Sequence, residues 1–115
     1  MARYDVANFS ELDGVVKKVR KALGVTAFGV NYFDLPPGAE GLEHNETQTN
    51  QEEVYVYVKG SGRLRVGAEE IEVCEGVVVR VDPEVTRQPV AGEAGLQWVA
   101  IGAPKDGAYQ PPQWG

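Results

Sequence analysis

The chain has 115 residues, enough for one domain with a single modest core. Its 11 Lys and Arg against 17 Asp and Glu give a formal net charge of −6, so it lacks the basic surface that nucleic-acid phosphates require. One cysteine excludes an intrachain disulfide, and one histidine excludes mechanisms that need two imidazoles from one chain. The sequence shows neither an apolar run long enough to cross a membrane nor a secretory signal. We therefore expect a cytoplasmic protein that binds neither nucleic acid nor a membrane.

Residues 10–24 are predicted to form the one helix of the chain. Ser10 is a candidate N-cap, and Gly24 suits the left-handed position after the last turn. The apolar residues recur at helical spacings of three and four: Leu12, Val15, Val16, Val19, Ala22 and Leu23. Because the helix is short and lacks an aromatic anchor, we expect it to pack on its own domain. Residues 1–24 are therefore assigned as an N-terminal segment with an amphipathic helix.

From Val25 onward the hydrophobic period changes to two, which is typical of β-strands. The predicted strands are 25–35, 53–59, 63–66, 69–73, 77–81, 85–90 and 96–101, with turns at 60–62, 67–68 and 91–95. Short strands separated by Gly and Pro turns predict an all-β sandwich or barrel over residues 25–103.

Four residues outside the candidate site carry separate expectations. Cys74 lies within a predicted strand, which favours burial of its side chain, and Trp98 is expected in the core. Prolines exclude a helix or a central strand from the tail, residues 104–115. The tail's Tyr109 and Trp114 are expected to pack on the barrel or on a partner subunit.

The long polar loop 39–51 and the strand after it resemble the first motif of the cupin superfamily. The resemblance rests on a Pro-Gly turn at Gly38, the spacing Gly38-x₅-His44 and the spacing Glu53-x₆-Gly60. Residues 75–87 resemble the second motif of the same superfamily. The resemblance implies a small single-domain cupin of the conserved-barrel type. Its fold would be a double-stranded β-helix, the jelly-roll barrel, with one N-terminal helix, and it would be a homodimer.

In typical cupins three histidines and the first-motif glutamate hold a divalent metal inside the barrel. Counting from the Pro-Gly turn places His44 and Glu46 at the first two ligand positions, whereas counting back from Glu53 places Glu46 and Gln48 there. Arg87 stands where the second motif has its histidine. The set His44, Glu46 and Glu53 suits Fe, Mn or Zn, but a buried arginine would repel the cation. We therefore expect degenerate metal motifs, no cofactor and a solvated His44, with a divalent metal site as the alternative.

The period of two also places Glu53, Tyr55 and Tyr57 on one face of their strand. With Arg87, which would neutralise the carboxylate or grip an anion, they form a candidate site for a small molecule. A structural ion pair with tyrosines in the core is the other interpretation. The leading hypothesis is a cupin that binds a small polar or anionic molecule in its barrel. The alternatives are a metal-dependent oxygenase or isomerase at the three metal-ligand candidates and an interaction domain with a filled barrel. No residue in the sequence identifies a reaction.

Overall fold

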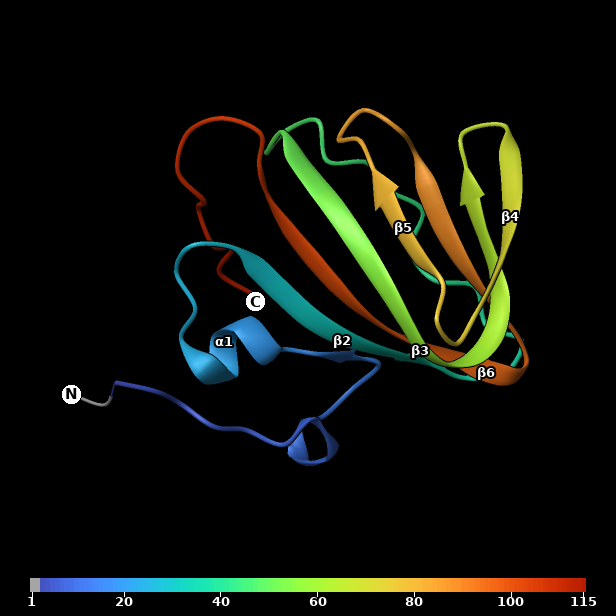
Figure 1. Cartoon of the computed structure of the whole chain (residues 1–115), viewed down its shortest axis with the longest axis horizontal. Helices are drawn as coiled ribbons and strands as arrows, with labels where there is room; N and C mark the ends of the chain where they lie inside the picture. The colour runs from blue at the N-terminus through green and yellow to red at the C-terminus, as the bar shows by residue number, and fades with distance from the viewer. Residues whose placement is uncertain (1–2) are drawn as a thin grey trace.

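The computed structural model of the protein describes residues 3–115, and it is mostly β-structure (Figure 1). Its elements are the 3₁₀ turn η1 (Phe9–Glu11), β1 (Val16–Lys17), α1 (Val19–Leu23), β2 (Gly29–Leu35), β3 (Gln51–Val66), β4 (Glu69–Cys74), β5 (Val78–Val81) and β6 (Arg87–Pro104). The strands form a six-stranded antiparallel sheet in the order β1-β2-β6-β3-β4, with β5 paired to β3. The predicted all-β class with one N-terminal α-helix is confirmed.

The two longest strands, β3 and β6, carry the sheet through a bend. Residues 51–57 pair with 98–104, residues 59–60 with 96–97, and residues 62–66 with 87–91, with a register shift between each block and the next. The strand β5 lies beside the first half of β3, and β4 lies beside the second half. Buried side chains from both halves form one core cluster: Leu35, Tyr55, Tyr57, Leu64, Val73, Val81, Ala91, Leu96, Trp98 and Ala100. The bend therefore folds the sheet over a single interior.

Glycines at the bend let the backbones of β3 and β6 approach closely. Gly60 has a φ of +82°, and a Cβ atom there would collide with the carbonyl oxygen of Gly95. A Cβ atom at Gly62 would collide with the carbonyl oxygen of Val90. The predicted turn at 60–62 is wrong, because these residues lie within the continuous strand β3 and pair with β6. The predicted turn at 91–95 lies within β6, where residues 92–95 form an irregularity without pairing partners. The glycines permit close approach of two bent strands rather than reversal of the chain.

The N-terminal helix is shorter than predicted. It ends as expected at Gly24, whose φ is +74°, but it begins only after β1. Gly14 has a φ of +84°, which is incompatible with an α-helix, and it therefore breaks the predicted helix ahead of β1. Ser10 is therefore not the cap of α1, and its backbone N–H instead donates to the side chain of Asn8 at 3.0 Å. Among the described residues, no helix has the length and apolar character to cross a membrane.

The core expectations for Trp98 and Cys74 have different outcomes. Trp98 is 3% exposed and stacks on Phe33 with ring centroids 4.9 Å apart, which confirms its core position. Cys74 is exposed, so the prediction of burial is wrong. Because side chains alternate along β4, Val73 takes the inward position and its neighbour Cys74 points outward.

The C-terminal tail packs back on the barrel near α1 and β2 (Figure 1). Tyr109 is 9% exposed, and its ring lies against Gly29. The Nε atom of Arg20 donates a 2.6 Å hydrogen bond to the carbonyl oxygen of Gly115. Trp114 remains 59% exposed at the edge of the tail.

Candidate functional site

The inner face of β3 carries Glu53, Tyr55 and Tyr57, as the period of two predicts. The Oε1 atom of Glu53 accepts a 2.7 Å hydrogen bond from the Tyr55 hydroxyl and another of 2.7 Å from Nη2 of Arg87. Arg87 also donates from Nε to the Tyr55 oxygen at 3.1 Å. Its Nη1 atom donates to the carbonyl oxygen of Val85 at 2.7 Å. The guanidinium of Arg87 is therefore engaged by acceptors of the protein itself.

Arg87 acts on the charge state of Glu53. The Arg87 side chain is fully buried, and burial alone would raise the pKa of the Glu53 carboxyl. Hydrogen bonds from His44, Tyr55 and Arg87 outweigh burial and hold that pKa below its usual range. Glu53 is consequently a carboxylate at neutral pH, and Arg87 serves as its counter-ion.

The backbone of Arg87 also positions His44. The His44 N–H donates to the Arg87 carbonyl at 3.0 Å, and the Arg87 N–H donates to the His44 carbonyl at 2.9 Å. This isolated bridge joins the long loop before β3 to the first residue of β6. Arg87 thus contacts Glu53 through its side chain and His44 through its backbone, which holds the two residues next to each other.

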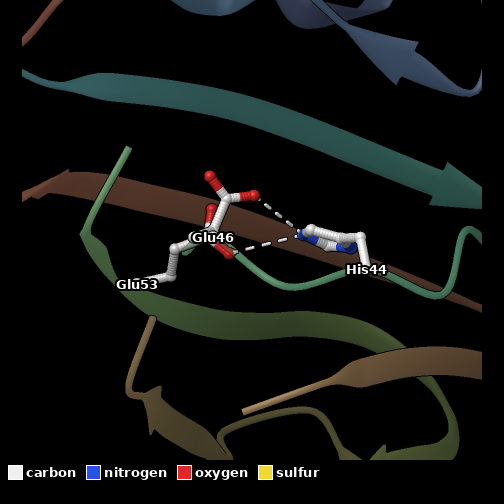
Figure 2. A group of neighbouring side chains, drawn as sticks. All are labelled: His44, Glu46 and Glu53. Carbon is white, nitrogen blue, oxygen red and sulfur yellow. Dashed lines mark ion pairs between the residues drawn. The ribbon is translucent and has the colours of Figure 1, made fainter. Parts of the chain in front are cut away.

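Two carboxylates face the same ring nitrogen of His44 (Figure 2). Its Nε2 atom is 3.2 Å from Oε2 of Glu46 and 3.8 Å from Oε1 of Glu53. Hydrogen bonding to Glu46 and then to Glu53 raises the pKa of the imidazole to about 9, although burial opposes the shift. The expectation of a solvated loop histidine is wrong, because the loop folds His44 onto the inner face of β3.

We call these three side chains the His–Glu–Glu group: His44, Glu46 and Glu53. Each offers a ligand atom, and the three atoms lie within 4.8 Å of one another. One imidazole nitrogen and two carboxylate oxygens form a donor set that suits Fe, Mn or Zn. The set therefore fits a divalent cation, which would have to displace the proton that His44 carries at neutral pH. Gln48, the other candidate for this position, is exposed and lies outside the group.

The group faces a cavity of about 720 Å³, within the range typical of small-molecule sites. A smaller space of about 60 Å³ lies next to it and shares His44 and Glu53 among its lining residues. Among the described residues, the lining of the two spaces includes no Lys or Arg. Two polar side chains of the described lining lack a hydrogen-bond partner in the protein. They are Asn31 in the larger cavity, through its buried Oδ1 atom, and Tyr57 in the smaller space, through its buried hydroxyl.

Several lining residues do not stand out in the sequence. Asn31 sits within an apolar strand, where a polar residue on the inner face is the one signal available. Trp98 belongs to the core as predicted but also lines both spaces. Tyr109 and Trp114 of the tail line the larger cavity, and their aromatic character had indicated only that the tail packs somewhere.

Several solved structures similar to this chain are cupins. A cupin protein from Bacteroides fragilis is 22% identical with a TM-score of 0.81, and the match covers 97% of this chain and 93% of that one. A protein from Photorhabdus luminescens is 14% identical with a TM-score of 0.73, covering 91% and 90%. A sugar phosphate isomerase of the cupin superfamily from Silicibacter pomeroyi is 24% identical with a TM-score of 0.68, covering 76% and 57%.

Neither a protein-family model nor a curated protein sequence matches the chain. The structural matches establish the expected cupin jelly-roll fold.

Proposed function

We propose that this protein binds a small, hydroxyl-rich molecule in its barrel. The observation that carries the proposal is the cavity of about 720 Å³ at the His–Glu–Glu group, together with two buried polar atoms that have no partner in the protein. A buried polar atom without a partner is costly, and a ligand that supplies one recovers that cost. An interaction domain with a filled barrel, the third hypothesis, would have no such cavity, so the cavity favours ligand binding over that hypothesis.

The polar groups around the cavity define what the ligand must offer. The carboxylates of Glu46 and Glu53 and the Oδ1 atom of Asn31 accept hydrogen bonds, whereas the Tyr57 hydroxyl can donate one. A hydroxyl group satisfies both kinds of partner because it donates and accepts. Trp98 and its stacked neighbour Phe33 add an apolar wall for the carbon skeleton. A polyol or an uncharged sugar matches this combination.

An anionic ligand matches the cavity less well than a neutral one. Two carboxylates face the cavity, and protonated His44 offsets only one of them; the described lining residues include no Lys or Arg to offset the other. The Arg87 guanidinium is fully buried and already donates to Glu53, Tyr55 and Val85. We therefore assign Arg87 the role of positioning residue for Glu53 and His44, and we narrow the ligand class from polar or anionic to polar and uncharged.

Calorimetric titration with D-glucose, D-mannose and inositol, and with glucose 6-phosphate as the anionic comparison, tests this proposal. We expect at least one neutral compound to bind and the phosphate to bind more weakly. Tyr57→Phe removes one hydroxyl from the smaller space and should weaken binding by roughly tenfold, the cost of about one hydrogen bond. Tyr4→Phe is the matched control, because Tyr4 is 77% exposed and does not line either space. Preferential binding of the phosphate would contradict the proposal.

A second candidate function is a metal-dependent reaction of the oxygenase or isomerase type. The close approach of the three donor atoms of the His–Glu–Glu group favours it. His44, Glu46 and Glu53 would hold a divalent Fe, Mn or Zn ion, which would supply Lewis acidity or redox chemistry beside the cavity. Arg87 would keep Glu53 ionised, as a carboxylate ligand must be.

Metal analysis of untagged protein, after incubation with each ion and gel filtration, tests the second candidate. We expect about one ion per chain if the group is a metal site, and loss of that ion in His44→Ala. Glu43→Ala is the control, because Glu43 is an exposed carboxylate next to the site and not part of the group. Unchanged metal content in His44→Ala would rule out the group as the binding site.

A further inference from the structure

Three of the exposed apolar side chains line the larger cavity. They come from separate parts of the chain: Val15 directly precedes β1, Leu42 belongs to the loop before β3, and Trp114 belongs to the tail. They are 45%, 76% and 59% exposed in that order. Single apolar residues scattered over a surface are ordinary, whereas apolar residues that gather around a concave site indicate binding. We call these three side chains the apolar rim.

The tail is anchored on both sides of Trp114. Before it in the chain, the ring of Tyr109 is buried against Gly29. After it, the carbonyl oxygen of Gly115 accepts the 2.6 Å hydrogen bond from Nε of Arg20. The same guanidinium donates from Nη1 to a backbone carbonyl just after α1 at 2.8 Å, which holds it in place. The backbone therefore presents the exposed indole of Trp114 at the cavity.

The apolar rim and the His–Glu–Glu group lie toward different strands of the sheet. Glu53 is on β3, whereas Val15 adjoins β1, and the sheet order places β2 and β6 between these two strands. A Cβ atom at Gly115 would lie 3.8 Å from Cγ of Lys18, which directly follows β1, so Trp114 is also toward the β1 side. With about 4.8 Å between neighbouring strands, β1 and β3 are about 14 Å apart along the sheet. A single sugar ring is shorter than this separation.

Apolar side chains connect the two sides of the cavity. The strand register aligns Val16, Phe33, Trp98 and Tyr57 in one row from β1 to β3. Directly opposite residues of neighbouring strands share a face of the sheet. The first three line the larger cavity, and Phe33 and Trp98 stack in its wall. A ligand that binds at the His–Glu–Glu group and extends toward the rim therefore meets apolar side chains along its path.

We propose that the ligand carries an aryl substituent, which lies against the apolar rim while the hydroxyl-rich part binds at the His–Glu–Glu group. The inference rests on the proposed function, and it narrows the ligand class from a free polyol or sugar to a neutral aryl glycoside. An aryl ring buries apolar surface against Val15 and Leu42, and its flat face suits stacking on the Trp114 indole. The exposed apolar rim and the charged group across the cavity are thus two parts of one site.

Calorimetric titration with two matched pairs of neutral glycosides tests the inference: methyl and phenyl β-D-glucoside, and methyl and phenyl α-D-mannoside. The members of a pair carry the same hydroxyl groups and differ only in the substituent. In at least one pair we expect the phenyl compound to bind at least tenfold more tightly than the methyl compound. Trp114→Ala should reduce this ratio to about threefold or less, whereas Trp114→Phe, which keeps an aromatic ring, should retain most of it. Tyr4→Ala is the control for loss of an exposed aromatic residue, because Tyr4 lines neither space.

The outcomes separate this inference from the proposed function. Equal binding of the methyl and phenyl compounds would overturn the inference and leave the proposed function standing. A loss of affinity in Trp114→Ala by the same factor for both members of a pair would also overturn it, because Trp114 would then contact the sugar ring. Phenol is the third probe, and phenol binding as tight as that of the phenyl glycosides would overturn both, because the hydroxyl groups would contribute nothing. Absence of binding by all four glycosides and by the neutral compounds named above would overturn the proposed function and, with it, the inference.

Discussion

Replacing Arg87 by methionine measures how much the buried ion pair stabilises the barrel. The change leaves the Glu53 carboxylate buried without its nearest counter-ion, since the two groups are 2.7 Å apart. Removing one partner of a buried pair typically costs about 3–5 kcal/mol. Glu53 retains the hydrogen bond from Tyr55 and its proximity to His44, so we expect the lower end, about 3 kcal/mol.

Urea unfolding followed by tryptophan fluorescence provides the free energy of unfolding for each variant. A loss of about 3 kcal/mol is a large part of the 5–15 kcal/mol that stabilises most domains, and it corresponds to a fall in Tm of roughly 12 °C. Glu53→Gln, made alone and together with Arg87→Met, completes a double-mutant cycle. We expect the double variant to lose about 1–3 kcal/mol less than the sum of the two single losses, because no unpaired charge remains.

Arg80→Met is the control for loss of an arginine from an ion pair. Arg80 pairs with Glu52 at 3.0 Å on the exposed outer side of the sheet, so water screens the interaction and the change in stability should be small. The reasoning is refuted if Arg87→Met destabilises the protein no more than Arg80→Met. It is also refuted if the losses in the Arg87 and Glu53 variants simply add.

Three further predictions address charge, backbone and exposure. His44 has a pKa raised to about 9 against 6.5 when unfolded, so its stabilisation is complete below pH 6.5 and lost as the pH rises through 9. The stability difference between the unmodified chain and His44→Gln, measured by urea unfolding in EDTA, should therefore shrink by about 1–2 kcal/mol from pH 6 to pH 9.5, and a constant difference would contradict it. Gly60→Ala should lower the stability by more than about 2 kcal/mol in thermal melts, because its Cβ atom meets the Gly95 carbonyl at a positive φ; a neutral effect would show that the bend relaxes. Cys74 should react completely with a thiol reagent in the folded protein, and protection until unfolding would contradict its exposure.

The local sequence pattern was sufficient to predict which residues of β3 share its inner face. Side chains of a strand alternate between its two faces whatever the rest of the chain does, so Glu53, Tyr55 and Tyr57 had to share a side. The spacing of Gly38, His44, Glu53 and Gly60 then indicated the cupin fold. The same local reasoning wrongly assigned the glycines at 60–62 to a turn. Glycine is favoured both in tight turns and where two bent strands approach closely, so the residue type alone does not distinguish the two.

For the β-branched residues of β3 and β5, the sequence predicts which face of the sheet they occupy but not which residues lie beside them. Val54, Val56 and Val78 alternate with inward-facing side chains, which fixes them to the outer face. Only the assembled sheet shows that they lie side by side on the neighbouring strands β3 and β5, where Val78 is 64% exposed. A patch is a property of neighbouring strands, and the pairing of strands is not encoded within any one of them.

The composition limited the chain to one imidazole, and the motif comparison placed that imidazole on a loop before β3. Two features were decided only by tertiary structure: that His44 reaches Glu46 and Glu53, and that Arg87 turns to Glu53 and away from the cavity. His44 and Arg87 are distant in sequence and meet through a backbone bridge between a loop and β6. Local pattern fixes which face a side chain occupies, whereas such long-range backbone contacts fix which charges become neighbours. The sequence therefore determined the fold and the candidate residues, and the folding of the loop over the sheet decided their chemistry.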